Sequence, residues 1–91
     1  MTSLTPKQVA SKRAEAQRLD VTVHVGKNGV HEATLAELDR QLKAHKLVKV
    51  RLLPAATEGG VGERQQADAL AAGTGAEVID VRGRTAVLWR A

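Results

Sequence analysis

Cysteine is absent from this chain of 91 residues. Disulfide bonds, a thiolate nucleophile and a zinc site built on cysteine are therefore excluded, and the composition is compatible with a reducing compartment. No apolar run approaches the roughly 18 residues that a membrane-spanning helix needs, and residues 1–6 lack the apolar core of a signal peptide. We therefore expect an unprocessed cytoplasmic protein that makes no contact with a membrane.

Aromatic side chains are scarce, because one tryptophan stands without any phenylalanine or tyrosine. RNA-binding folds that stack bases on several aromatic rings are disfavoured for that reason. The two serines, Ser3 and Ser11, do not lie in a nucleophile-elbow sequence. The three histidines lack the spacing of a metal site. We therefore expect no enzymatic activity, no metal and no cofactor.

Positive charge is in excess and is unevenly distributed. The formal net charge is +4, and residues 1–54 hold ten lysines and arginines against five acids, whereas the remainder holds four against five. One stretch of the first part is basic and contains no acid; its cations are Arg40, Lys43, Lys46, Lys49 and Arg51. This run favours a polyanionic partner such as nucleic acid, but a solvated face that keeps a small protein soluble explains it equally well.

Three helices are expected. The segment Thr5-Pro6-Lys7-Gln8 is a capping box, so a first helix should begin there and run to about Arg18. The spacing of apolar residues predicts an amphipathic second helix over residues 30–44. A third helix is expected over residues 63–72, with its C-terminal end marked by two glycines, Gly73 and Gly75.

Four strands are expected, over residues 21–25, 47–53, 76–81 and 84–90. In the second of them, Val48, Val50 and Leu52 alternate with Lys49 and Arg51, so apolar and basic side chains face opposite ways. The last two should form a hairpin with its turn at Arg82-Gly83. The element order α-β-α-β-α-β-β predicts a compact α/β sandwich, one domain over residues 1–91, in which helices pack on a small mixed four-stranded sheet. Residues 54–62 are expected to form a flexible, glycine-rich loop.

A glycine turn, Gly26-Lys27-Asn28-Gly29, joins the first strand to the second helix. We expect the positive, hydrogen-bond-donating end of that helix to point out of the turn, where it would attract anions. Glycines allow a sugar-phosphate backbone to approach closely, as in the G-x-x-G loop of KH domains. A strand-to-helix turn also needs glycine for purely conformational reasons, so the motif alone does not establish a binding site.

Five segments in order resemble the CRM domain family, the chloroplast RNA splicing and ribosome maturation domain, in its bacterial stand-alone YhbY-type form. The segments are Leu4 to Gln8, Val25 to Val30, Leu47 to Val50, Thr74 to Glu77 and Gly83 to Arg90. The resemblance covers essentially the whole chain. It implies a fold similar to the C-terminal domain of bacterial translation initiation factor three, and RNA binding in association with precursors of the large ribosomal subunit.

The expected partner is therefore RNA, namely large-subunit ribosomal RNA or its precursor, with ribosomal proteins as possible neighbours and the chain itself monomeric. The residues expected to contact RNA are Gly26, Lys27, Asn28, Gly29, Lys46, Lys49, Arg51 and Arg84. One alternative stays open at this point. The chain could be a protein-interaction module that docks on ribosomal proteins or another partner through its sheet face or final hairpin, with its charge incidental.

Overall fold

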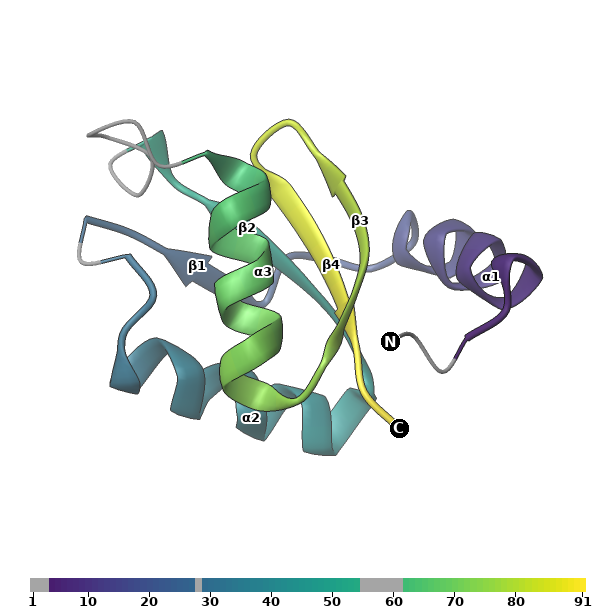
Figure 1. Cartoon of the computed structure of the whole chain (residues 1–91), viewed down its shortest axis with the longest axis horizontal. Helices are drawn as coiled ribbons and strands as arrows, with labels where there is room; N and C mark the ends of the chain where they lie inside the picture. Colours follow the sequence, from purple (N-terminus) through teal and green to yellow (C-terminus); the bar gives the residue numbers. More distant parts are fainter. Residues whose placement is uncertain (1–3, 28, 55–61) are drawn as a thin grey trace.

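The computed structural model describes residues 4–27, 29–54 and 62–91, in which three helices and four strands follow the order expected from the sequence (Figure 1). The helices are α1 (Pro6–Ala16), α2 (Glu32–His45) and α3 (Glu63–Thr74). The strands are β1 (Val23–Val25), β2 (Leu47–Leu52), β3 (Glu77–Arg82) and β4 (Thr85–Trp89). The α/β sandwich is thereby confirmed. Most of the expected glycine-rich loop and Asn28 lie outside the described residues.

The four strands form one mixed sheet in the order β1-β2-β4-β3. Strands β1 and β2 are parallel, as their connection through α2 requires, and β4 runs antiparallel to both of its neighbours. The turn between β3 and β4 lies at Gly83-Arg84, one residue later than expected, because Arg82 still pairs with Thr85. Gly83 has a φ of +57°, which a glycine adopts without strain.

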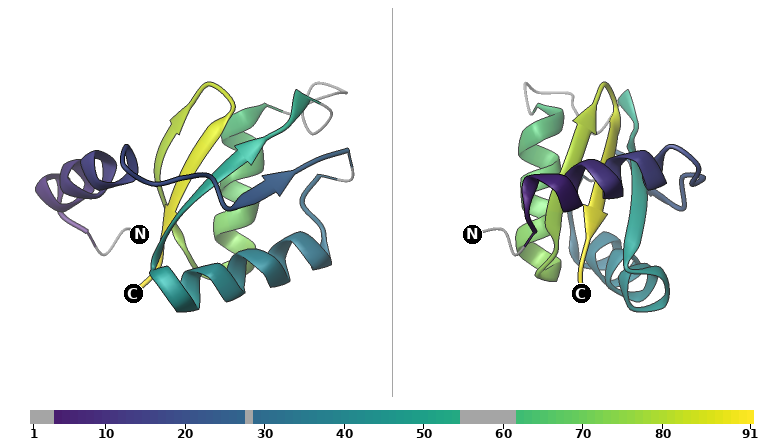
Figure 2. Two further views of the ribbon diagram at one scale, coloured as in Figure 1. Left: turned by 180° about the vertical axis from the view of Figure 1, so that it is seen from behind. Right: turned by 90° about the vertical axis from the view of Figure 1, so that its right-hand side faces the viewer.

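Each face of the sheet carries a separate core. Helices α2 and α3 cover one face, where Leu38, Val50, Leu70 and Leu88 are fully buried. Helix α1 covers part of the other face, on a smaller cluster formed by Ala16, Leu47, Ile79 and Val87. Figure 2 shows α1 apart from α2 and α3, across the strands. None of the helices described here has the length and apolar character needed to cross a lipid bilayer.

Helices α1 and α3 each end at a residue other than the one the sequence predicts. Helix α1 does begin with the Thr5 capping box, in which the Thr5 side chain accepts from the Gln8 amide and the Gln8 side chain accepts from the Thr5 amide. It ends at Ala16, two residues earlier than Arg18. Helix α3 continues through Gly73 to Thr74, so Gly75 alone, at φ +72°, forms the left-handed C-cap.

Gly73 has a packing role inside α3 rather than a capping role. A Cβ atom at this position would lie 2.6 Å from Leu35 Cδ2 of α2. The missing side chain thus lets α2 and α3 approach each other closely over the sheet.

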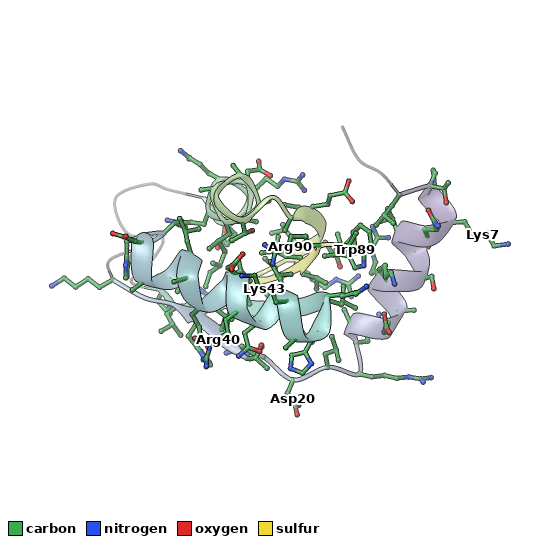
Figure 3. All side chains as sticks on the ribbon, turned by 90° about the horizontal axis from the view of Figure 1, so that it is seen from below. Lys7, Asp20, Arg40, Lys43, Trp89 and Arg90 are labelled. Atoms are coloured by element: carbon green, nitrogen blue, oxygen red, sulfur yellow. The ribbon has the colours of Figure 1, made fainter. Side chains whose placement is uncertain are left out.

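The C-terminal segment is tied to both of these helices by Arg90. Its guanidinium donates to Asp39 Oδ1 on α2 at 2.7 Å, to the Thr74 carbonyl at the end of α3 at 2.7 Å and to the Asp39 carbonyl at 3.2 Å. Figure 3 shows Arg90 above α2, next to Lys43. This contact therefore holds the chain after β4 against α2 and the C-terminal end of α3.

Candidate nucleic-acid interface

The glycine turn and the β3–β4 hairpin turn lie on either side of the end of β2. The Leu53 amide donates to the Val25 carbonyl at 2.9 Å, and the Leu52 amide donates to the Arg84 carbonyl at 2.6 Å. These bonds bring Gly26, Lys27 and Gly29 to the same end of the sheet as Gly83 and Arg84 (Figure 1). We call these five residues the turn end.

The glycine turn is closed by a hydrogen bond from the Gly29 amide to the Gly26 carbonyl at 2.9 Å. Gly29 has a φ of +63°, so a glycine is favoured there on conformational grounds alone. A Cβ on Gly29 would lie 3.7 Å from the buried side chain of Gln66, so the inner side of the turn rests on α3. Lys27 is exposed in this turn and presents its charge to solvent.

Helix α2 does not begin directly at the turn, which corrects the expectation that its free amides point out of it. Val30 and His31 intervene, and His31 caps the helix by accepting from the Ala33 amide on Nδ1 at 3.2 Å. Glu32 adds negative charge to the first helical turn, where the helix dipole favours it. His31 and Glu32 therefore partly compensate the positive end of α2. A bound anion would be held mainly by the glycine turn and by basic side chains.

Lys49 and Arg51 lie on the face of the sheet that carries α1, opposite the main core, as the alternation in β2 predicts. Arg51 is exposed and pairs across the strands with His24 on one side and Thr85 on the other, and Thr85 pairs with Arg82. This row crosses all four strands. We call its members together with Lys49 the open sheet face: His24, Lys49, Arg51, Arg82 and Thr85.

Lys46 lies at the other end of β2 from the glycine turn. It precedes Leu47, so about six residues at roughly 3.3 Å each, some 20 Å, separate it from the turn end. Lys46 forms the C-cap of α2 with φ 65°, and its carbonyl accepts from the Arg90 amide. The structure brings Lys27, Arg51 and Arg84 toward one end, and it does not bring Lys46 there.

The two cations of the basic run on α2 are paired with acids of the same helix. Arg40 binds Glu37, and Lys43 lies 3.2 Å from Asp39. Hydrogen bonds from Arg40, and then from Gln41, lower the pKa of Glu37. A hydrogen bond from Arg90, and then one from Lys43, lower the pKa of Asp39. The positive charge of the run is thus least compensated in β2.

Sequence reasoning did not single out His24, Arg82 or Arg13 as parts of this surface. His24 is found by alternation, because Val23 and Val25 are buried on either side of it. Alternation does not find Arg82, because a register shift in β3 decides which face of the sheet Arg82 lies on. Arg13 of α1 lies near the same strand, with Nε 3.7 Å from Asp80 Oδ2.

The fold and this surface define a small α/β domain with a glycine turn and solvent-exposed cations at one end of a mixed sheet. The family model described as the CRS1 / YhbY (CRM) domain matches residues 4–90, and the chain belongs to this family. The resemblance inferred from the five segments is confirmed.

Individual relatives agree with this assignment. A protein of Methanocaldococcus jannaschii named as a probable RNA-binding protein is 39% identical over 87 residues, which are 96% of this chain and 63% of that protein. The probable RNA-binding protein YqeI of Bacillus subtilis is 31% identical over 96% of this chain and 88% of its own length. The solution structure of a hypothetical Staphylococcus aureus protein, described as a candidate RNA-binding protein, superposes with a TM-score of 0.81 at 27% identity, covering 97% of this chain and 88% of that one.

Proposed function

We propose that this protein binds RNA through the turn end and the open sheet face, without catalysing a reaction. The observation that carries the proposal is the position of the glycine turn, with exposed Lys27, at the same end of the sheet as Arg84 and next to the exposed row that contains Arg51. These three cations belong to three separate chain segments whose backbones meet at this end of the sheet. The relatives' names, which refer to RNA binding and to no reaction, support the same conclusion.

The expected mechanism is recognition of the sugar-phosphate backbone. Phosphates near Lys27 and Arg51 would release condensed counterions, which makes the affinity depend steeply on salt. Gly29 lets the turn adopt φ +63°, and a side chain on Gly26 or Gly29 would point toward Leu53 or Gln66 of the chain itself, so the ribose-phosphate strand would meet the outer side of the turn and Lys27. The partly capped α2 end would add a weak attraction at most. Lys46 is too far from this end to bind the same phosphates.

The natural ligand in this proposal is structured ribosomal RNA of large-subunit precursors, met in the cytoplasm by a monomeric protein. The support for this part is the family to which residues 4–90 belong and the scarcity of aromatic side chains, which disfavours reading of single-stranded bases by stacking. Discrimination would come mainly from RNA shape.

Binding is tested with the purified chain and a structured ribosomal RNA fragment, by fluorescence anisotropy at several salt concentrations. Lys27→Ala should weaken binding about three- to tenfold, and Lys7→Ala is the matched control. Lys7 loses the same charge but projects from α1, at the far side of the molecule from the turn end (Figure 3). Equal losses in the two variants would refute the turn as a contact and leave only general attraction by net charge.

The natural partner is tested by crosslinking the protein in cell extract and sequencing the attached RNA. Recovery of large-subunit precursor RNA, with release of the protein from ribosomal particles by nuclease, is the expected result. Association that resists nuclease and is insensitive to salt would instead show docking on a protein.

A further inference from the structure

A cavity of about 160 Å³ lies between α1 and the sheet, next to the open sheet face. Ala16 of α1 and Val87 of β4 provide an apolar floor. The polar side chains around it are those of Arg13, Gln17, Lys49, Asp80, Arg82 and Thr85. A closed protein cavity of about 150 Å³ holds benzene. This cavity is similar in volume but open to solvent, so it can take the edge of a planar base whose remaining atoms stay outside it.

The acid of this cavity is placed by a β-bulge. The register of β3 against β4 shifts between Val78 and Asp80, so that Asp80 pairs with Val87 and Arg82 pairs with Thr85. Without the shift, strict alternation from Ile79 would point Asp80 and Arg82 toward α2 and α3. The bulge instead brings both side chains to the face of Lys49.

The Asp80 carboxylate lies near two arginines but is not hydrogen-bonded to either of them. Its Oδ2 lies 3.7 Å from Arg13 Nε and 3.8 Å from Arg82 Nη2, both longer than a hydrogen bond. The side chain is 23% exposed, and a carboxylate accepts hydrogen bonds on both oxygens. Lys49 forms no ion pair with any described residue. A site for phosphate alone would gain nothing from a carboxylate, which repels anions.

We infer that this cavity takes one unpaired guanine base of the bound RNA, an inference that rests on the proposed function. The Watson–Crick edge of guanine offers two adjacent N–H donors, N1 and N2, beside the acceptor O6. The two donors match the oxygens of Asp80, and O6 matches a cation such as Lys49 or Arg13. Adenine, cytosine and uracil each offer one donor group on that edge, so none of them satisfies a carboxylate in this way.

The cavity is continuous with the proposed backbone contacts. Lys49 and Arg51 are two residues apart on one face of β2, about 7 Å along the strand, and Arg51 lies nearer to the turn end. Thr85 and Arg82 belong to both the cavity and the exposed row. An RNA strand whose phosphates bind Arg51 and Lys27 can therefore place one base in the cavity between α1 and the sheet.

The inference is tested first by changing the RNA, which leaves the protein folded. Hairpins that differ in one bulged nucleotide, guanosine, adenosine, cytidine, uridine or inosine, are titrated into the wild-type chain under one salt condition. The guanosine hairpin should bind about tenfold more tightly than the adenosine hairpin. Inosine lacks only the N2 amino group and should lose most of that preference. Equal affinities across the series would overturn the guanine site.

The second test is Asp80→Asn, with Asp68→Asn as control. Asp68 is exposed on α3 and pairs with Arg64, away from the cavity, so both variants gain the same unit of positive charge. Asp68→Asn should bind all hairpins somewhat more tightly and keep the ratio between guanosine and adenosine. Asp80→Asn should bind the guanosine hairpin less tightly than the wild type does and lose that ratio. An unchanged ratio in Asp80→Asn would refute the role of the carboxylate. Loss of the guanosine preference in a chain that still binds RNA affects this inference alone, whereas no binding to any hairpin refutes the proposed function itself.

Discussion

Arg90→Ala is predicted to destabilise the fold strongly although Arg90 lies one residue from the C-terminus. Its guanidinium joins two helices, because it donates to the side chain and main chain of Asp39 on α2 and to the Thr74 carbonyl at the end of α3. The Arg90 amide, which the substitution keeps, donates to the Lys46 carbonyl. The Thr74 carbonyl belongs to the last turn of a helix, where the carbonyls have no partner within the helix. Loss of the side chain therefore leaves acceptors on two helices without their donor.

The magnitude follows from the exposure of the partners. Hydrogen bonds from a charged donor contribute about 1.5–3 kcal/mol when shielded, and the Arg90 side chain is 20% exposed. The Asp39 side chain is 38% exposed, so the ion pair itself is screened and adds little. The Thr74 carbonyl supplies most of the effect, because it lies in the last turn of α3 whereas the Asp39 carbonyl lies inside α2, and we expect a loss of about 2 kcal/mol. In a chain of this size that corresponds to a fall in Tm of roughly 8–16 °C.

The measurement is thermal unfolding followed by circular dichroism or calorimetry, with Arg40→Ala as the matched control. Arg40 lies on α2 as well, but its side chain is 73% exposed and its ion pair with Glu37 lies within the same helix. Its removal should cost about 0.5 kcal/mol or less. If Arg90→Ala unfolds within a degree or two of Arg40→Ala, the reasoning that the Thr74 carbonyl dominates is wrong.

The same contact predicts a dependence on pH. Hydrogen bonds from Arg90 and then Lys43 lower the pKa of Asp39 in the folded protein. A lowered folded-state pKa contributes stability that is fully present above the unfolded value of about 3.9 and is lost as the pH falls through the folded value. The wild type should therefore lose more stability than Asp39→Asn when the pH falls below about 4. Parallel Tm curves of the two proteins between pH 7 and pH 2 would contradict this.

Three further predictions compare the turn end with positions elsewhere in the chain. Lys27→Ala should reduce the slope of log affinity against log salt by about one, and Lys7→Ala should not. Gly29→Asp and Gly75→Asp both place an aspartate at positive φ and should each cost about 1 kcal/mol of stability by thermal unfolding, but only Gly29→Asp should reduce RNA affinity beyond the effect of charge. Lys46→Gly should raise stability by about 1 kcal/mol, because φ 65° is strained for lysine, and should weaken RNA binding less than Lys27→Ala does.

Local signals along the chain were sufficient for the elements and for the basic side of β2. The Thr5 capping box starts α1 with two reciprocal hydrogen bonds. Its partners are three residues apart, so the motif can be recognised from the local sequence. The alternation of Val48 and Val50 with Lys49 assigns each side chain to a face, because the period of a strand is two. Both inferences need no knowledge of distant residues.

The start of α2 was harder to predict, because its N-cap residue is a histidine. Histidine is not among the residues that favour the N-cap position, so the apolar period over Val30 and Ala33 pointed to a start two residues too early. That error made the helix end look like part of the glycine turn. In the folded chain His31 accepts the Ala33 amide, and the anion site has to be argued from Lys27 and the sheet instead.

The guanine site could not have been predicted from the sequence, for a reason that applies to many sites built on sheets. Asp80 and Lys49 are 31 positions apart, and the facing of Asp80 depends on one extra residue, Ile79, in β3. A one-residue change in register exchanges the two faces of everything that follows, and no periodicity in a six-residue strand reveals it. With regular pairing Asp80 would be a carboxylate facing a hydrocarbon core, which is costly unless it is paired. A bulge at Ile79 avoids that burial and, by the same shift, gives the cavity beside Lys49 its carboxylate.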